Sequence, residues 1–270
     1  MIFQIQIFTL TTLGAHAATL ITGRFQQLPL PVPASYRNGT SRGWGLNIFF
    51  MFKHLSTILL LFALIACSSP KSSSLSVIEL TDSSFVNDKQ SFVIFCDSIG
   101  IAPEMLQQHG QRLIIVDSKT ANEARVSQLR EQFPAVQIIH FENDVYHFDA
   151  QKHCNTPHAK QRQYIVLSTQ LVADTHMQNQ YLHYHEHQFE LWPEVAKGFC
   201  QAAFDELIIF KHERELMLII ALDASLNFET QNAKTTLNNP RVDEWNALMA
   251  KYQTSRPGET DTWIFYSPIK

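Results

Sequence analysis

The stretch Glu206-Leu-Ile-Ile-Phe-Lys-His-Glu-Arg-Glu-Leu-Met-Leu-Ile-Ile-Ala-Leu222 decides the fold of the C-terminal part of this chain. Its two apolar runs flank the charged turn Lys211–Arg214, a pattern typical of a β-hairpin with buried strands. Working outward, Tyr164–Val172 predicts a strand before the hairpin and Thr262–Tyr266 predicts one after it. Four strands are therefore expected, and the middle two are paired by the hairpin.

Two helical segments are predicted between these strands. One runs from about Thr175 to Ala203, and the other runs from Pro240 to Tyr252 with an apolar face; proline is favoured at a first helical position. The order strand–helix–strand–strand–helix–strand predicts a ferredoxin-like α+β domain over residues 163–270. Its sheet packs one face on the helices, so the other face must be covered as well. We expect a homodimer through this domain, as in a dimeric α+β barrel, or docking of the face onto the upstream residues.

Residues 76–150 predict a small parallel α/β module. The expected strands are Ser91–Cys96, Arg112–Asp117 and Val136–Phe141, and the expected helices are Ala102–His109 and Ala121–Phe133. Alternation of strands and helices at this spacing is typical of a parallel sheet. The module has no Gly-rich phosphate loop, so we assign it no function. The polar residues 151–162 are the predicted linker to the C-terminal domain.

A targeting signal is predicted near the N-terminus. Met51-Phe-Lys-His is a short basic start, and an apolar run of nine residues follows at 58–66, which suits a signal peptide better than a bilayer span. The run ends in Leu64-Ile-Ala-Cys67, which resembles a bacterial lipobox, although a buried strand or a plain transmembrane anchor would also give an apolar run. We predict a signal peptide over 51–66 and acylation of Cys67.

The segments around this signal complete the predicted organisation. A Ser-rich linker is expected over 67–75, and residues 1–50 fit no domain, which makes Met51 rather than Met1 the expected start of translation. Because Ser68 and not Asp follows the cysteine, we expect a lipid-anchored protein in the periplasm of a Gram-negative bacterium, at the outer membrane.

Composition and charge narrow the function classes. The chain has 270 residues, of which 45% are hydrophobic and 17% charged, which excludes a disordered chain. Residues 1–78 contain no Asp or Glu, so all 25 acidic residues lie after them. Of the 21 basic residues, 17 lie after Cys67, and the part of the chain from Cys67 onward therefore has a net charge of −8. An acidic body lacks the surface that a nucleic acid needs, so no nucleic-acid partner is expected.

Three cysteines follow Cys67 in the sequence. Cys96, Cys154 and Cys200 are widely spaced, and no Cys-x-x-Cys motif indicates a zinc site. Two of them could pair in an oxidising compartment, but the sequence leaves open which two.

Three motifs in the C-terminal domain carry a family resemblance. Tyr181-Leu-His-Tyr-His185 precedes Leu191-Trp-Pro-Glu-Val195, and Asn239-Pro-Arg-Val-Asp-Glu-Trp-Asn-Ala-Leu-Met249 and Trp263-Ile-Phe-Tyr266 follow. In this order they resemble the L-rhamnose mutarotases over about residues 163–270. The resemblance implies a small cofactor-free enzyme, usually dimeric, that interconverts the α and β anomers of L-rhamnose, L-fucose or a related deoxy sugar.

The resemblance also implies roles for individual residues. His185 would be the acid–base catalyst, which suits an imidazole whose ordinary pKa is about 6.5. Tyr181, one helical turn earlier, would hydrogen-bond a sugar hydroxyl, and Trp192 or Trp245 would offer an apolar wall to the sugar ring. The family usually spaces its histidine and tryptophan four residues apart, whereas His185 and Trp192 are seven apart. A continuous helix would keep both on one face, but Pro193 disfavours helical geometry just before it.

The sequence is also compatible with two other functions. The first is a non-catalytic sugar-binding lipoprotein on the same fold, and the second is an unrelated small-molecule binder or monooxygenase-like protein. His183 and His187, at i and i+4, resemble half of a helical zinc site, but no third ligand is identifiable. We expect no metal, and both of these side chains to be solvated.

Overall fold

The computed structural model describes residues 73–81 and 89–269. The signal peptide, Cys67 and the segment 1–50 that are predicted from the sequence lie outside the described residues. Residues 73–81 and 89–269 fall within one compact unit. Among them, no helix combines the length and the apolar character needed to span a membrane.

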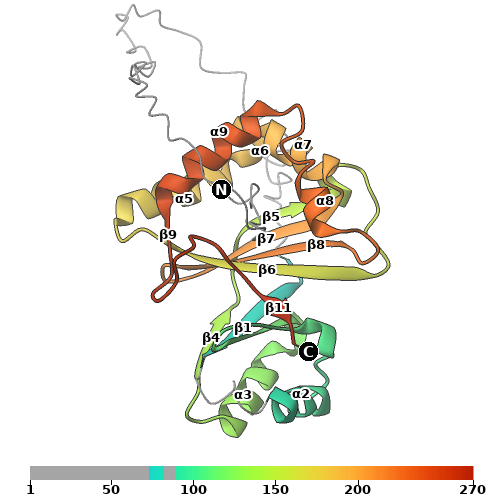
Figure 1. Cartoon of the computed structure of the whole chain (residues 1–270), viewed down its shortest axis with the longest axis vertical. Helices are drawn as coiled ribbons and strands as arrows, with labels where there is room; N and C mark the ends of the chain where they lie inside the picture. Colours follow the sequence, from blue (N-terminus) through green and yellow to red (C-terminus); the bar gives the residue numbers. More distant parts are fainter. Residues whose placement is uncertain (1–72, 82–88, 270) are drawn as a thin grey trace, which may run out of the picture. The chain divides into compact units, whose positions relative to one another are not determined.

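The hairpin of β7 and β8, which turns at Glu213 and Arg214, forms the centre of a curled antiparallel sheet (Figure 1). Its strands in spatial order are β10 (Ile264–Phe265), β6 (Arg162–Leu171), β8 (Glu215–Asp223), β7 (Phe204–His212) and β5 (Asp144–Asp149). A short strand, β9 (Gln253–Thr254), also pairs with β6. The four predicted C-terminal strands are confirmed, and β5 is an addition from further upstream.

The helices of the C-terminal part cover one face of this sheet. They are α5 (Thr175–Glu186), α6 (Gln188–Leu191), α7 (Pro193–Gln201), α8 (Phe228–Asn232), α9 (Pro240–Met249) and the 3-10 turn η5 (Ala250–Tyr252). The long helix predicted for 175–203 is therefore interrupted, at His187 and at Trp192. Trp192 has φ −137° and ψ 51°, because the residue before a proline is forced out of helical geometry.

The first sheet is also antiparallel, which corrects the predicted parallel module. It contains β2 (Leu106–His109), β3 (Arg112–Ser118), β1 (Leu75–Thr81) and β4 (Gln137–Phe141) in that spatial order, followed along the edge of β2 by β11 (Ser267–Pro268). Its helices are α2 (Lys89–Ser98) and α3 (Asn122–Gln132), with the 3-10 turns η3 (Pro103–Met105) and η4 (Lys119–Ala121). The predicted strands at 112–117 and 136–141 and the helix at 121–133 are confirmed.

Two elements of the first module were predicted wrongly. The segment Ser91–Cys96 is part of helix α2, because Phe92 and Cys96 are buried one turn apart while Ile94 is 60% exposed. The segment predicted as a helix at 102–109 is instead a 3-10 turn followed by β2, which is paired with β3 through the hairpin at Gly110. Strand β1, which was not predicted from the sequence, lies between β3 and β4 and is antiparallel to both. Because the hairpin pairs β2 and β3 in antiparallel fashion as well, the sheet is antiparallel throughout.

Strand β5 lies within the predicted first module, but its hydrogen bonds are to β7 in the second sheet. The predicted linker that follows contains most of α4 (Ala150–His153), which is capped by the carboxylate of Asp149. A disulfide joins Cys154, just after α4, to Cys200 in α7, and Cys96 is a buried free thiol.

The two sheets pack face to face through a shared apolar core. Val77, Ile114, Val116 and Phe141 come from the first sheet, and Val166, Ile208, Phe210, Met217 and Ile219 come from the second. The neighbouring side chains on each strand point the other way, toward the helices that cover the outer faces. Of the two ways of covering the second sheet that the sequence left open, the structure shows docking onto the first module.

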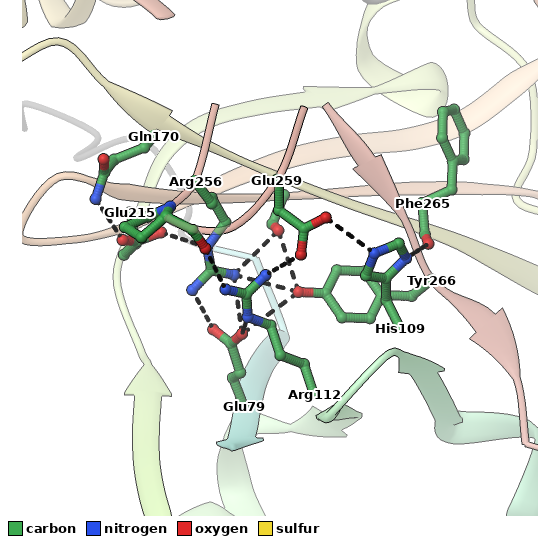
Figure 2. Close-up of polar contacts among 11 residues, drawn as sticks. Glu79, His109, Arg112, Gln170, Glu215, Arg256, Glu259, Phe265 and Tyr266 are labelled. Atoms are coloured by element: carbon green, nitrogen blue, oxygen red, sulfur yellow. Dashed lines mark hydrogen bonds and ion pairs between the residues drawn. The ribbon is translucent and has the colours of Figure 1, made fainter. Parts of the chain in front are cut away.

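A buried ionic network also connects the two sheets (Figure 2). The guanidinium of Arg256 donates to both carboxylate oxygens of Glu79 on β1, at 2.8 and 3.1 Å, and forms an ion pair of 2.7 Å with Glu215 on β8. Tyr266 donates its hydroxyl to Glu79, and Arg112 forms a second ion pair with the Glu79 carboxylate. Glu79 is completely buried, so its charge depends on these partners.

Candidate functional site

Helix α5 places two of the predicted site residues against the sheet. The helix begins at Thr175, and the side chain of Asp174 caps it by accepting from the Met177 N–H at 3.0 Å. Tyr181 and His185, one turn apart, are its buried residues, and their ring centroids are 4.1 Å apart. Helical spacing therefore delivers both side chains to the same interior surface.

The buried imidazole of His185 is held in one tautomer. Its Nδ1 lies 2.9 Å from the carbonyl oxygen of Tyr181, and since a carbonyl only accepts, Nδ1 carries the proton and donates it. Burial lowers the pKa of His185 to about 4, against the opposing effect of this hydrogen bond. The ring is therefore neutral at pH 7, with the lone pair of Nε2 available to accept a proton.

A small pocket opens beside His185 under the helices. Its walls are Tyr146, His185, Gln188, Phe199, Leu207, Ile209, Leu218 and Trp245. The space between these walls is about 270 Å³, part of it open to solvent, and the enclosed part has room for about one water molecule. The rings of Tyr146 and Trp245 meet the imidazole edge to face, at centroid distances of 5.3 and 5.1 Å.

Two polar residues of this pocket, Tyr146 and Gln188, lie outside the motifs that predicted the site. Tyr146, on β5, donates its hydroxyl to Oε1 of Gln188 at 3.0 Å. Gln188 is 1% exposed, and its Nε2 has no hydrogen-bond partner among the described residues. A buried amide donor without a protein partner at a pocket wall is suited to a ligand hydroxyl. The only sequence signal for Gln188 was its place in the extended spacing between His185 and Trp192.

The other predicted residues lie at different depths. Trp245, on α9, is 3% exposed and forms part of the pocket wall. Tyr181 and Trp192 stand behind the wall and pack on the rings of His185 and Trp245 respectively, with 5.6 Å between the two indoles. The outer face of Trp192 is covered by the guanidinium of Arg241, 3.9 Å from the ring centroid.

Comparisons with known proteins find similarity in the C-terminal part of the chain. Residues 165–267 match L-rhamnose mutarotase. An L-fucose mutarotase from Xanthomonas campestris pv. campestris is 32% identical over 69 residues, which are 26% of this chain and 54% of that protein. The chain thus spans about half the length of this curated relative. No solved structure matches the chain.

The segment similar to the L-rhamnose mutarotases contains most of the pocket. It runs from β6 to β11 and includes His185, Gln188 and Trp245. Tyr146 on β5 lies before it, as does the whole first sheet apart from β11. One wall of the pocket therefore comes from a part of the chain that the family match leaves out.

Two clusters of potential metal ligands lie elsewhere in the described part. One cluster consists of His183, Glu186 and His187, and the other consists of Asp149, His158 and Glu206. Within each cluster the possible ligand atoms lie within 4.8 Å of one another. The first is on the surface, with His183 exposed and His187 half-buried, and the second already contains the Arg162 guanidinium, 3.1 Å from Glu206. We assign neither cluster a metal.

Proposed function

We propose that this chain interconverts the α and β anomers of L-rhamnose, L-fucose or a related deoxy sugar, with His185 as the acid–base catalyst. The observation that carries the proposal is the neutral, buried imidazole with Nδ1 tied to the backbone and an indole beside it. It lies within the segment that is similar to the L-rhamnose mutarotases. Both the family and the curated relative are named for anomer interconversion of 6-deoxy sugars.

The chemistry needs one proton to move between two oxygens of the sugar. Nε2 of His185 accepts the proton of the anomeric hydroxyl while the bond between C1 and the ring oxygen breaks, and the imidazolium returns that proton to the ring oxygen. The open aldehyde rotates about C1–C2, and the same steps in reverse close the ring on the other face. The cycle leaves His185 neutral, so it consumes no cofactor or co-reactant.

Recognition of the sugar is assigned to the other pocket residues. The Trp245 indole offers a flat wall to the C–H face of the pyranose, and the free Nε2–H of Gln188 donates to a hydroxyl. A pyranose is larger than the enclosed space, so the pocket must widen. We propose that the part of helix α6 after Gln188, up to the break at Trp192, moves to admit it, while Gln188 stays held by Tyr146.

The test is magnetisation exchange between the anomeric proton signals of L-rhamnose and L-fucose. The wild type should exchange the two anomers faster than buffer alone, and His185→Ala should lose this acceleration. His183→Ala is the matched control, because it removes an exposed imidazole from the same helix and should leave the rate unchanged.

The outcomes separate this proposal from its alternative. Saturation transfer from the protein to a sugar without anomer exchange indicates a non-catalytic sugar-binding protein on the same fold. Equal exchange in the wild type and in His185→Ala contradicts the assigned role of the imidazole.

We also propose the finer fold assignment and the location. The strand order β10-β6-β8-β7, antiparallel and with helices on one face, supports a ferredoxin-like domain. The disulfide between Cys154 and Cys200 supports an oxidising compartment such as the periplasm, in agreement with the lipobox at Cys67. Incorporation of a labelled fatty acid by the expressed chain, and its loss in Cys67→Ser, tests the lipid anchor.

A further inference from the structure

The two sheets have the same strand order, element for element. The first is ordered β11-β2-β3-β1-β4, and the second, read from its β5 edge, is ordered β5-β7-β8-β6-β10. In both, the chain runs strand, helix, hairpin, helix, strand, so that β1, β2, β3 and β4 correspond to β6, β7, β8 and β10. All pairings in both sheets are antiparallel.

The strand that follows each unit crosses to the other sheet. After β4, the chain continues into β5, which pairs with β7. After β10, it continues into β11, which pairs with β2. Because β2 and β7 are corresponding strands, the exchange is reciprocal. A reciprocal exchange is what a two-fold related pair of subunits produces at an isologous interface.

The hairpins and the facing cores agree with this correspondence. His109-Gly-Gln-Arg112 links β2 to β3, and His212-Glu-Arg-Glu215 links β7 to β8. The first residue of each turn has a positive φ, 53° at Gly110 and 51° at Glu213, so the two turns share a left-handed backbone conformation at the same position. The inward-facing residues of β3, which are Ile114 and Val116, correspond to Met217 and Ile219 of β8, and both pairs belong to the core between the sheets.

We infer that residues 75–149 are a second, degenerate copy of the unit formed by residues 162–268, and that this copy occupies the position of a partner subunit. The role of the first module is then to cover the second sheet and to exchange strands with it. This replaces the homodimer expected through the C-terminal domain, because the sheet face that such a dimer needs is already buried within the chain.

The two copies contribute unequally to the site. Helices α2 and α3 contain no histidine, tyrosine or tryptophan, so the first copy has no counterpart of His185 or Trp245. It contributes through its exchanged strand instead, because β5 places Tyr146 beside Ile209 in the pocket wall and against Gln188. Tyr146 is a positioning residue, since its hydroxyl fixes Oε1 of Gln188 and leaves Nε2 for the ligand. This role rests on the proposed function, whereas the duplication does not.

The exchange is tested with a cysteine pair across β11 and β2. Ser267 and Gln108 are directly opposite each other in that ladder, a separation that a disulfide can bridge. The full chain carries Gln108→Cys, Ser267→Cys and also Cys67→Ser, so that Cys67 cannot form the bond instead. Each single cysteine variant in the same background is the control.

Oxidation should give a bond within one chain. We expect a single-chain species on a non-reducing gel, a cross-linked peptide joining positions 108 and 267, and a yield that does not change over a 100-fold dilution. A disulfide-linked pair of chains made by the double variant alone overturns the inference, because β11 would then pair with a different molecule. Failure to form the bond in the folded chain overturns it too.

The role of Tyr146 is tested by a double-mutant cycle on sugar binding. Tyr146→Phe and Gln188→Leu should each weaken binding several-fold, and the double variant should bind no worse than Gln188→Leu alone. Additive losses contradict the positioning role. Absence of both sugar binding and exchange in the wild type refutes the proposed function, while the cross-linking result still decides the duplication.

Discussion

Protonation of His185 should destabilise the folded chain below pH 6.5. In the unfolded chain a histidine has a pKa of about 6.5, whereas burial lowers the pKa of His185 to about 4. Above pH 6.5 the ring is neutral in both states, and the full stability is present. Between pH 6.5 and 4 only the unfolded chain binds the proton, so the free energy of unfolding falls as the pH falls, and below pH 4 the loss is complete.

The size of this loss follows from the difference in pKa. Each unit corresponds to about 1.4 kcal/mol, so the difference of about 2.5 units gives about 3 kcal/mol between pH 7 and pH 4. The ring is 4% exposed, so solvent screening reduces this figure little. The same pKa predicts that the anomer exchange rate stays level from pH 5 to 8 and falls below about pH 4.

The assay compares urea unfolding of the wild type with that of His185→Asn from pH 7 to pH 4. The asparagine amide can still donate to the Tyr181 carbonyl, but it does not titrate. Other groups titrate equally in both proteins, so the difference between the two free energies of unfolding isolates residue 185. That difference should change by about 3 kcal/mol in disfavour of the wild type as the pH falls. A difference that is constant with pH would refute the assignment of His185 as a buried neutral imidazole.

Three further predictions concern stability, each measured by urea unfolding. Replacing Cys154 and Cys200 by serine should cost about 4 kcal/mol, because their disulfide closes a loop with a sequence separation of 46, and a reductant should then have no further effect on the variant. Gly198→Ala should cost about 1–3 kcal/mol, since its Cβ would lie 2.6 Å from a backbone carbonyl oxygen in the loop after α8; an unchanged stability would mean that this loop yields freely. Arg256→Met should cost about 3–5 kcal/mol because it leaves the buried Glu79 charge short of a partner, and adding Glu79→Leu should recover part of the loss; no recovery would contradict the ionic network as the cause.

The parts of the fold that were predicted correctly have a strong local pattern. The second hairpin combines two apolar runs with a charged turn, and helix α9 begins at a proline, so neither depends on distant residues. The prediction of a strand at Ser91–Cys96 was wrong because the five residues after Ser91 form a continuous apolar run. Such a run fits a buried strand as well as a helix. Only the packing of Phe92 and Cys96 against the first sheet decides between them.

The candidate site was predictable only where it lies on one helix or in one motif. His185, Tyr181 and Trp245 were named from the motifs that resemble the L-rhamnose mutarotases, and the spacing of four residues only places Tyr181 and His185 on one face of a helix. Gln188 could not be recognised because its importance depends on the interruption of the helix at His187, which turns α6 into a separate piece of the pocket wall. Tyr146 could not be recognised because it reaches the site through the pairing of β5 with β7, about 60 residues away in the chain.

The pairing of β5 with β7 connects the duplication to the site. An antiparallel sheet that buries both faces needs a second layer, and a free partner would have to be recruited from solution at the cost of its translational and rotational freedom. A partner on the same chain is held at a high effective concentration, so the interface persists at any dilution. Once the first copy was tethered in this way, it could lose a pocket of its own and still be required, because its exchanged strand carries the hydroxyl that orients Gln188. The first module is thus expected to tolerate change on α2 and α3 but not at Tyr146, and a set of substitutions confined to the exposed faces of those two helices should leave sugar binding intact.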